Sequence, residues 1–169
     1  LFCFCENSLK NFNITEFFIP QTILQSNEPK LNYDSKGALY YKNRLFSGYL
    51  VKKSRDGNLI EKKGYYNGYL EGKSLGYFEN GNLKFRRFYK AGKKNGIHKG
   101  WYESGQKKFK YFFDKGLSVG KHIQWYDSGQ IYSEINYLNG KPFGSTKVWR
   151  KDGKLRSNFV IRENGRRYG

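Results

Sequence analysis

Apolar and polar residues alternate over short stretches along most of the chain. The segment LKFRRFYK, residues 83–90, places Leu83, Phe85 and Tyr89 on one side of an extended chain and mainly basic residues on the other. Alternation with a period of two residues is typical of a β-strand with one better-covered face. No window shows a sustained apolar period of 3.6 residues. The pattern therefore predicts an all-β protein with strands of about eight residues.

Glycines recur at a constant interval of 24 residues in three series. The series are Gly57, Gly81, Gly105, Gly129 and Gly153; Gly68, Gly92, Gly116 and Gly140; and Gly48, Gly72, Gly96, Gly120 and Gly144. Gly165 and Gly169 keep the spacing of the second and third series after one inserted residue. A period between about 20 and 50 residues indicates a repeat architecture. About five repeats predict an elongated, twisted antiparallel ribbon or solenoid, in which each repeat is stabilised by its neighbours.

Each repeat is predicted to be a β-hairpin with two kinds of turn. Asn80-Gly81 separates two aromatic-rich runs and is the strongest short-range signal of a two-residue loop, whereas Gly-x-x-x-Gly stretches such as GKKNG are expected to be longer reverse turns. A two-residue loop fixes which residues face each other across the hairpin. The expected pairs are Phe78–Leu83, Tyr77–Lys84, Gly76–Phe85, Gly100–Phe109, Gln124–Ser133 and Val148–Ser157. A phenylalanine over a facing glycine restores packing in a strand and supports this register.

This register divides the ribbon into two faces. The apolar face is expected to hold Phe78, Leu83, Phe85, Tyr89, Tyr102, Phe109, Tyr111, Phe113, Tyr126, Ile131, Ile135 and Tyr137. The other face mixes rings with cations and is the candidate contact surface. Its candidate binding strip is Tyr77, Trp101, Trp125, Trp149, Lys84, Arg86, Lys108 and Lys110. The tryptophan column has two interpretations, packing within the ribbon or contact with a partner.

At its glycine and aromatic positions the sequence resembles the MORN repeat family, and most closely the bacterial variant found in proteins labelled YwqK-type antitoxins. The matching stretches include YYNGYLEGKSLGYFENGNLK, YKAGKKNGIHKGWYESGQKK, FDKGLSVGKHIQWYDSGQIY and YLNGKPFGSTKVWRKDGKLR. The resemblance covers about residues 38–169. It implies stacked β-hairpins that bind proteins or membrane lipids, and the antitoxin label implies neutralisation of a partner. Gln124 and Val148 stand where the family pattern has glycine.

The charge distribution places a domain boundary near residue 38. Residues 1–38 hold three basic and four acidic residues, whereas residues 39–169 hold 29 basic and ten acidic residues, a net charge of +19. Nineteen of the 20 glycines lie in the second part. We expect a linker over residues 6–38 that leads into a repeat array over 39–169. The basic excess has two interpretations, a polyanion partner or the lysine-rich composition of an AT-rich genome.

The first residues, LFCFCENS, resemble the end of a signal-peptide apolar region over residues 1–5. Cys5 is then a candidate lipid-attachment site, although Phe4 precedes it where a small residue is expected, and Cys3 and Cys5 are equally well explained as ordinary signal-sequence residues. This pattern predicts export, either to the bacterial cell envelope as a lipoprotein or into the medium. The array contains no cysteine, so no disulfide is expected to stabilise it.

The sequence offers little catalytic chemistry. His98 and His122 occupy one column of successive repeats, about 10 Å apart, which is too far to share a metal ion, and they are expected to be polar surface residues. The acids of the array lie mostly beside turns, and no phosphate-binding loop follows the glycine-rich segments. We therefore expect a non-enzyme without metal, cofactor or small-molecule substrate.

Three functions fit this sequence. The first is a non-catalytic scaffold that binds a protein partner at the cell envelope or outside the cell. The second is an antitoxin-like inhibitor, which rests on the resemblance. The third is a basic module that attaches to anionic phospholipid or another polyanion. Nucleic acid would fit a surface of rings and cations, but an exported protein would rarely meet it.

Overall fold

The computed structural model describes residues 18–169, and this part of the chain contains strands and turns but no helix. The strands are β1 (Ile23–Gln25), β2 (Leu31–Tyr33), β3 (Leu39–Tyr41), β4 (Arg44–Leu45), β5 (Gly48–Lys53), β6 (Leu59–Tyr66), β7 (Tyr69–Tyr77), β8 (Leu83–Lys90), β9 (Lys93–Lys94), β10 (Gly96–Trp101), β11 (Lys107–Asp114), β12 (Leu117–Ser118), β13 (Gly120–Trp125), β14 (Ile131–Leu138), β15 (Lys141–Trp149), β16 (Leu155–Ile161) and β17 (Arg167–Tyr168). The predicted all-β fold is confirmed.

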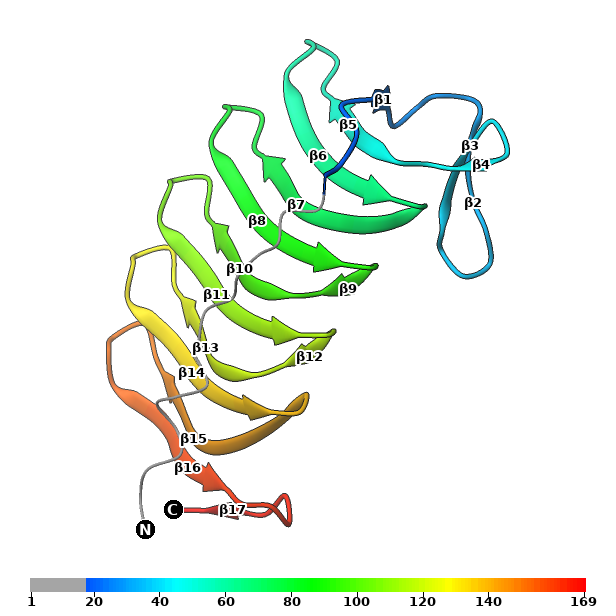
Figure 1. The fold of residues 1–169 in the computed structure, drawn as a ribbon. Helices are drawn as coiled ribbons and strands as arrows, with labels where there is room; N and C mark the ends of the chain where they lie inside the picture. The colour runs from blue at the N-terminus through cyan, green and yellow to red at the C-terminus, as the bar shows by residue number, and fades with distance from the viewer. Residues whose placement is uncertain (1–17) are drawn as a thin grey trace.

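Fourteen strands form one long open sheet, whose main path runs in chain order from β5 to β17. Successive strands on this path are antiparallel, and β1 pairs in parallel with β5 at the sheet edge. Figure 1 shows a curved stack of bowed hairpins, with long turns along one edge and tight turns along the other. The stack contains five hairpins, namely β5–β6, β7–β8, β10–β11, β13–β14 and β15–β16. The predicted elongated ribbon of about five repeats is therefore confirmed.

The two turn types are the reverse of those expected. At Asn80-Gly81 the Gly81 amide donates to the Phe78 carbonyl (3.0 Å), the Phe78 amide donates to the Asn82 carbonyl (2.9 Å), and of the turn residues only Gly81 has a positive φ. This is a four-residue turn that ends in a left-handed glycine, not a two-residue loop. The two-residue loops lie in the second glycine series, where both central residues have positive φ as a type I′ turn requires. They are Asn67-Gly68, Ala91-Gly92, Lys115-Gly116 and Asn139-Gly140.

The four-residue turn closes all five hairpins, at residues 54–57, 78–81, 102–105, 126–129 and 150–153. A further copy spans residues 162–165, where the Gly165 amide donates to the Arg162 carbonyl (2.8 Å). Gly165 thus ends a four-residue turn. This turn joins β16 to β17 and so takes the place of a second-series turn, displaced by one residue as predicted, but it has the four-residue form.

The third glycine series bends strands instead of making turns. Gly72, Gly96, Gly120 and Gly144 lie in strands and face Tyr89, Phe113, Tyr137 and Ile161 across the hairpin. Their φ values lie between +65° and +76°, a conformation that favours glycine. The turn role predicted for this series is therefore wrong, because these glycines lie within strands.

The four-residue turns are called the long turns from here on. The predicted register holds away from them and fails beside them. Gly76–Phe85, Gly100–Phe109, Gln124–Ser133 and Val148–Ser157 face each other as expected. Nearer the turn the strand carries one extra residue, so Tyr77 faces Leu83 instead of Lys84. The longer turn causes this shift. A Cβ at Gly76 or Gly100 would overlap the facing phenylalanine ring, so the close approach itself requires glycine.

The two-residue type I′ turns are called the tight turns from here on. Hydrogen bonds from the tight turns join each hairpin to the one before it. Each turn glycine donates its amide to a carbonyl of the preceding repeat, in the pairs Gly68–Phe46, Gly92–Leu70, Gly116–Lys94 and Gly140–Ser118, at 2.8 or 2.9 Å. The side chain of Tyr69 packs on Gly92, and that of Leu117 packs on Gly140. These contacts use the exposed apolar residues of this edge to hold the repeats in step.

The N-terminal end of the array is capped by a second sheet of β2, β3 and β4. Leu39 is fully buried there and forms a small core with Phe46, Leu50 and Tyr65. Residues 6–38, predicted to be a linker, thus contribute strands β1 and β2. The predicted leader over residues 1–5, with Cys5, lies outside the described residues.

We predict that Gly100→Ala lowers the free energy of unfolding by about 1–3 kcal/mol, because the new methyl group meets the Phe109 ring. Chemical denaturation of the single variants and of the double variant with Phe109→Ala measures the coupling. Phe109→Ala removes the ring that the new methyl group would overlap. The double variant should therefore lose less stability than the sum of the losses in the two single variants. Simple additivity would contradict this packing.

Candidate functional site

The sheet presents a tryptophan face, which carries Tyr77, Trp101, Trp125 and Trp149 in one column. Their cross-strand partners are Leu83, Lys107, Ile131 and Leu155, respectively. Facing residues of antiparallel strands share a face, so Leu83 and Ile131 belong here and not on the apolar face where the sequence placed them. All four rings of the column are partly buried.

Tyrosines at the long turns bond to the backbone of the tryptophan column. The Tyr102 hydroxyl donates to the Trp125 carbonyl (2.8 Å), and the Tyr126 hydroxyl donates to the Trp149 carbonyl (2.9 Å). Each bond joins one repeat to the next. The tryptophan backbone is therefore fixed in position while part of each ring stays accessible.

Two cations of the predicted strip lie on the opposite face. Lys84 and Lys108 occupy the extra residue position beside the long turn. The Nζ of Lys84 lies 5.3 Å from the centre of the Phe78 ring, and that of Lys108 lies 5.0 Å from the centre of the Tyr102 ring. Their assignment to the tryptophan strip fails because the longer turn shifts the alternation. Both are exposed.

Arg86 and Lys110 do lie on the tryptophan face, and the structure adds Lys99 between them. All three are partly buried. Burial, and then the charges of Arg86 and Lys110, lower the pKa of Lys99 below its ordinary value. Lys107 also joins this face, with its Nζ 5.9 Å from the centre of the Trp125 ring. The sequence reasoning missed Lys99 and Lys107; Lys99 could have been found because it lies two residues before Trp101.

The other side of the sheet, the histidine face, carries Phe85, Tyr89, His98, Phe109, Tyr111, Phe113, His122, Ile135 and Tyr137. A continuous series of ring contacts crosses its centre. The successive centroid distances are 5.5 Å for Tyr89–His98, 4.7 Å for His98–Phe113, 5.5 Å for Phe113–His122 and 4.4 Å for His122–Tyr137. This series packs the centre of the array.

The histidines are buried, so their predicted role as polar surface residues is wrong. His98 is 2% exposed and His122 is 7% exposed. Each Nε2 donates to a backbone carbonyl ten residues earlier, that of Phe88 (2.7 Å) or Phe112 (2.8 Å). Burial lowers the pKa of His98 to about 4 and also lowers the pKa of His122. Both rings are therefore neutral packing residues near pH 7.

The comparison with known families identifies the repeats. The sequence model of the MORN repeat variant family matches residues 70–91, 94–115 and 118–139. Residues 70–139 are MORN-variant repeats. Each matched segment extends between successive tight turns and holds one long turn near its centre. No curated protein matches the chain.

The family resemblance is thus confirmed over these three MORN repeats. Hairpins β5–β6 and β15–β16 carry the same long turn on either side of them. Residues 18–169 include no helix of the length and apolar character that a membrane crossing requires. Within the same residues, no group of three or more His, Cys, Asp or Glu side chains is placed to hold a metal ion.

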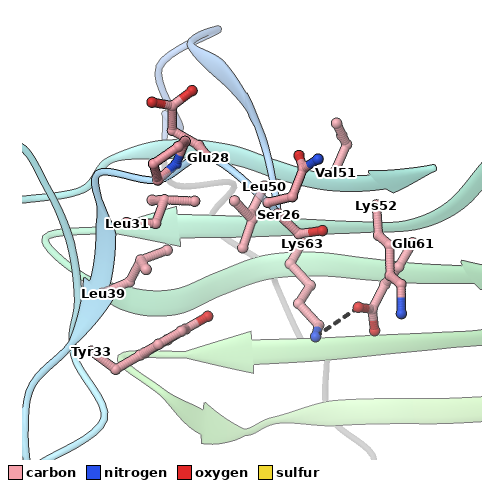
Figure 2. Close-up of a pocket in the computed structure, with 12 residues that line it drawn as sticks. Ser26, Glu28, Leu31, Tyr33, Leu39, Leu50, Val51, Lys52, Glu61 and Lys63 are labelled. Carbon is pink, nitrogen blue, oxygen red and sulfur yellow. Dashed lines mark ion pairs between the residues drawn. The ribbon is translucent and has the colours of Figure 1, made fainter.

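A hollow of about 410 Å³ lies where the capping sheet meets the first hairpin. Figure 2 shows Leu31, Leu39 and Leu50 around it, together with an ion pair between Lys63 and Glu61. The Lys63 Nζ lies 2.8 Å from the Glu61 carboxylate, so these two charges neutralise each other. The hollow therefore combines apolar walls with a self-neutralised ion pair.

The buried histidine predicts an acid-sensitive fold. The pKa of His98 is lowered from 6.5 to about 4 on folding, so its stabilising contribution is complete above about pH 6.5 and is lost as pH falls toward 4. We expect this loss to be on the order of 3 kcal/mol. Urea denaturation at pH values from 7 to about 4 measures it, as the difference between the wild type and His98→Gln. Parallel curves for the two proteins would contradict the assignment.

Proposed function

We propose that this protein is a non-catalytic repeat scaffold that binds a partner protein on its tryptophan face. The observation that carries the proposal is the column of Tyr77, Trp101, Trp125 and Trp149, one partly exposed ring per repeat on a single face. Tryptophan and tyrosine are enriched where proteins meet. The array therefore repeats, hairpin by hairpin, the residue types that anchor an interface.

The dimensions of the column suit a protein partner. Each hairpin advances the sheet by about 10 Å, so four rings in successive hairpins span roughly 30 Å. A stable interface covers about 800 Å² on each partner. A strip of this length with the neighbouring residues on either side provides such an area.

The tyrosine bonds to the tryptophan backbone support the proposal. Because the Tyr102 and Tyr126 hydroxyls hold successive hairpins together, the rings they adjoin keep fixed relative positions. Fixed groups lose less conformational entropy when a partner binds. The column is therefore a preorganised surface.

The net charge of +18 favours a second candidate, attachment to anionic phospholipid or another polyanion. Co-sedimentation with phosphatidylglycerol vesicles should then weaken sharply as salt rises from about 0.05 to 0.5 M, because salt screens exposed charges. Binding that ignores salt, or no binding, would exclude this candidate. The inhibitor role implied by the resemblance stays a prediction about the partner's activity.

The proposal predicts that the double variant Trp101→Leu with Trp125→Leu loses the partner, because leucine keeps apolar packing but removes the rings that make contact. Affinity capture from cells that produce the protein, followed by titration of the captured partner, should show at least a tenfold weaker affinity. Phe143→Leu, which changes an exposed ring near the tight-turn end of β15, is the matched control and should bind as the wild type does. Circular dichroism verifies that each variant is folded. Equal capture by all three proteins would refute the site.

A further inference from the structure

Three cations on the tryptophan face stand directly beside one another on adjacent strands. Arg86 on β8 faces Lys99 on β10, and Lys99 faces Lys110 on β11. Their neighbours at the two ends of this row are uncharged, Leu75 on β7 and Ile123 on β13. The cation row of Arg86, Lys99 and Lys110 thus concentrates three positive charges within two strand spacings, about 10 Å.

This arrangement is unfavourable in the free protein. Like charges that face each other across a sheet destabilise it, and all three side chains are partly buried. The ion pairs among the described residues, Lys63–Glu61 and Lys121–Glu134, do not involve the cation row. The Nε of Arg86 is buried and has no hydrogen-bond partner within the described chain. A buried donor without a partner destabilises the folded state.

The same row is balanced in the next repeat, which provides an internal comparison. Beyond Ile123 it continues with Glu134 on β14 and Lys147 on β15, which face each other with opposite charges. The Glu134 carboxylate also lies 3.4 Å from the Nζ of Lys121. The fold therefore accommodates an acid in this row, and the lack of one between Arg86 and Lys110 is local.

We propose that the cation row is a carboxylate-binding site that receives an acidic segment of the partner protein. This inference rests on the proposed function, because it uses the same face. Carboxylate oxygens accept charge-assisted hydrogen bonds from guanidinium and ammonium groups, and the partly exposed side chains of Arg86, Lys99 and Lys110 carry these groups. Alternate side chains of an extended peptide lie about 7 Å apart on one side, so two acidic side chains fit the row.

The surroundings of the row favour an acidic peptide over a membrane surface. A lipid headgroup layer is broad and attracts an extended, uniformly basic face, whereas Glu134 interrupts this row two strands beyond Lys110.

The test uses the full chain and a fluorescent octaglutamate peptide as the probe, with fluorescence anisotropy at low salt. The wild type should bind the peptide, and Lys99→Gln should weaken binding at least tenfold because it removes the central charge. Lys147→Gln is the matched control, since it removes the same charge from the same row where Glu134 faces it, and it should bind within about twofold of the wild type. Thermal denaturation gives an independent readout: Lys99→Gln should leave the midpoint unchanged or raise it, because it relieves repulsion.

Each of the following outcomes overturns all or part of the inference. No binding of octaglutamate, or equal weakening by Lys99→Gln and Lys147→Gln, means that the row is not a site and that only net charge acts. Binding of phosphatidylglycerol vesicles that depends on Lys99, with no binding of octaglutamate, assigns the row to a membrane. Partner capture distinguishes a failure of the carboxylate site from a failure of the proposed function. Capture that is lost in the tryptophan double variant and kept in Lys99→Gln overturns the carboxylate site alone, whereas capture kept in the tryptophan variant overturns the proposed function.

Discussion

The structure depends on the hydrogen bond that each tight turn donates to the preceding hairpin. A type I′ turn points the glycine amide out of its own hairpin, and in this sheet the amide reaches a carbonyl of the repeat before it. Because the same bond recurs at Gly68, Gly92, Gly116 and Gly140, successive hairpins cannot slide past each other. A slip of one residue would also exchange the two faces of the sheet. Equivalent positions of successive repeats therefore stack in columns, and every other feature of the molecule follows from those columns.

The columns divide stability and recognition between the two faces. On the histidine face, neutral histidine rings alternate with phenylalanine and tyrosine rings. Each histidine donates its buried N–H to a backbone carbonyl. On the tryptophan face, rings remain partly exposed and three cations stand together without a facing acid. A repeat protein gains stability mainly from contacts between neighbours. It can therefore tolerate an unfavourable cluster on one face while the other face holds the array together, which is a common relation between stability and function.

The sequence was sufficient to predict the fold because its signals repeat. The constant spacing of the glycines gave the repeat length, and the Gly76–Phe85 and Gly100–Phe109 pairs gave the register. It could not distinguish the two turn types, because a left-handed glycine is required both in a two-residue loop and at the end of a four-residue turn. The deciding property is the φ of the preceding residue, which is positive at Ala91 and Lys115 although neither residue type favours it.

The incorrect turn explains the errors at the site. One additional residue beside each long turn carried Lys84 and Lys108 to the opposite face, while Arg86 and Lys110, farther from the turn, kept their predicted side. The burial of His98 was indicated by its position two residues before Gly100, on the face whose rings were expected to pack. The cation row requires pairing between repeats, in the contact of Arg86 with Lys99. Pairing within one hairpin cannot reveal such a contact.

Amide hydrogen exchange, measured by NMR on the native protein, tests the central claim most directly. The amides of Gly92, Gly116 and Gly140 lie in exposed two-residue turns, where an amide ordinarily exchanges quickly. If they bond to the preceding hairpin, they should exchange as slowly as strand amides such as that of Gly100. Exchange at the rate of unprotected loop amides would show that the hairpins are not joined in this register, and would contradict the columns on which both faces are built.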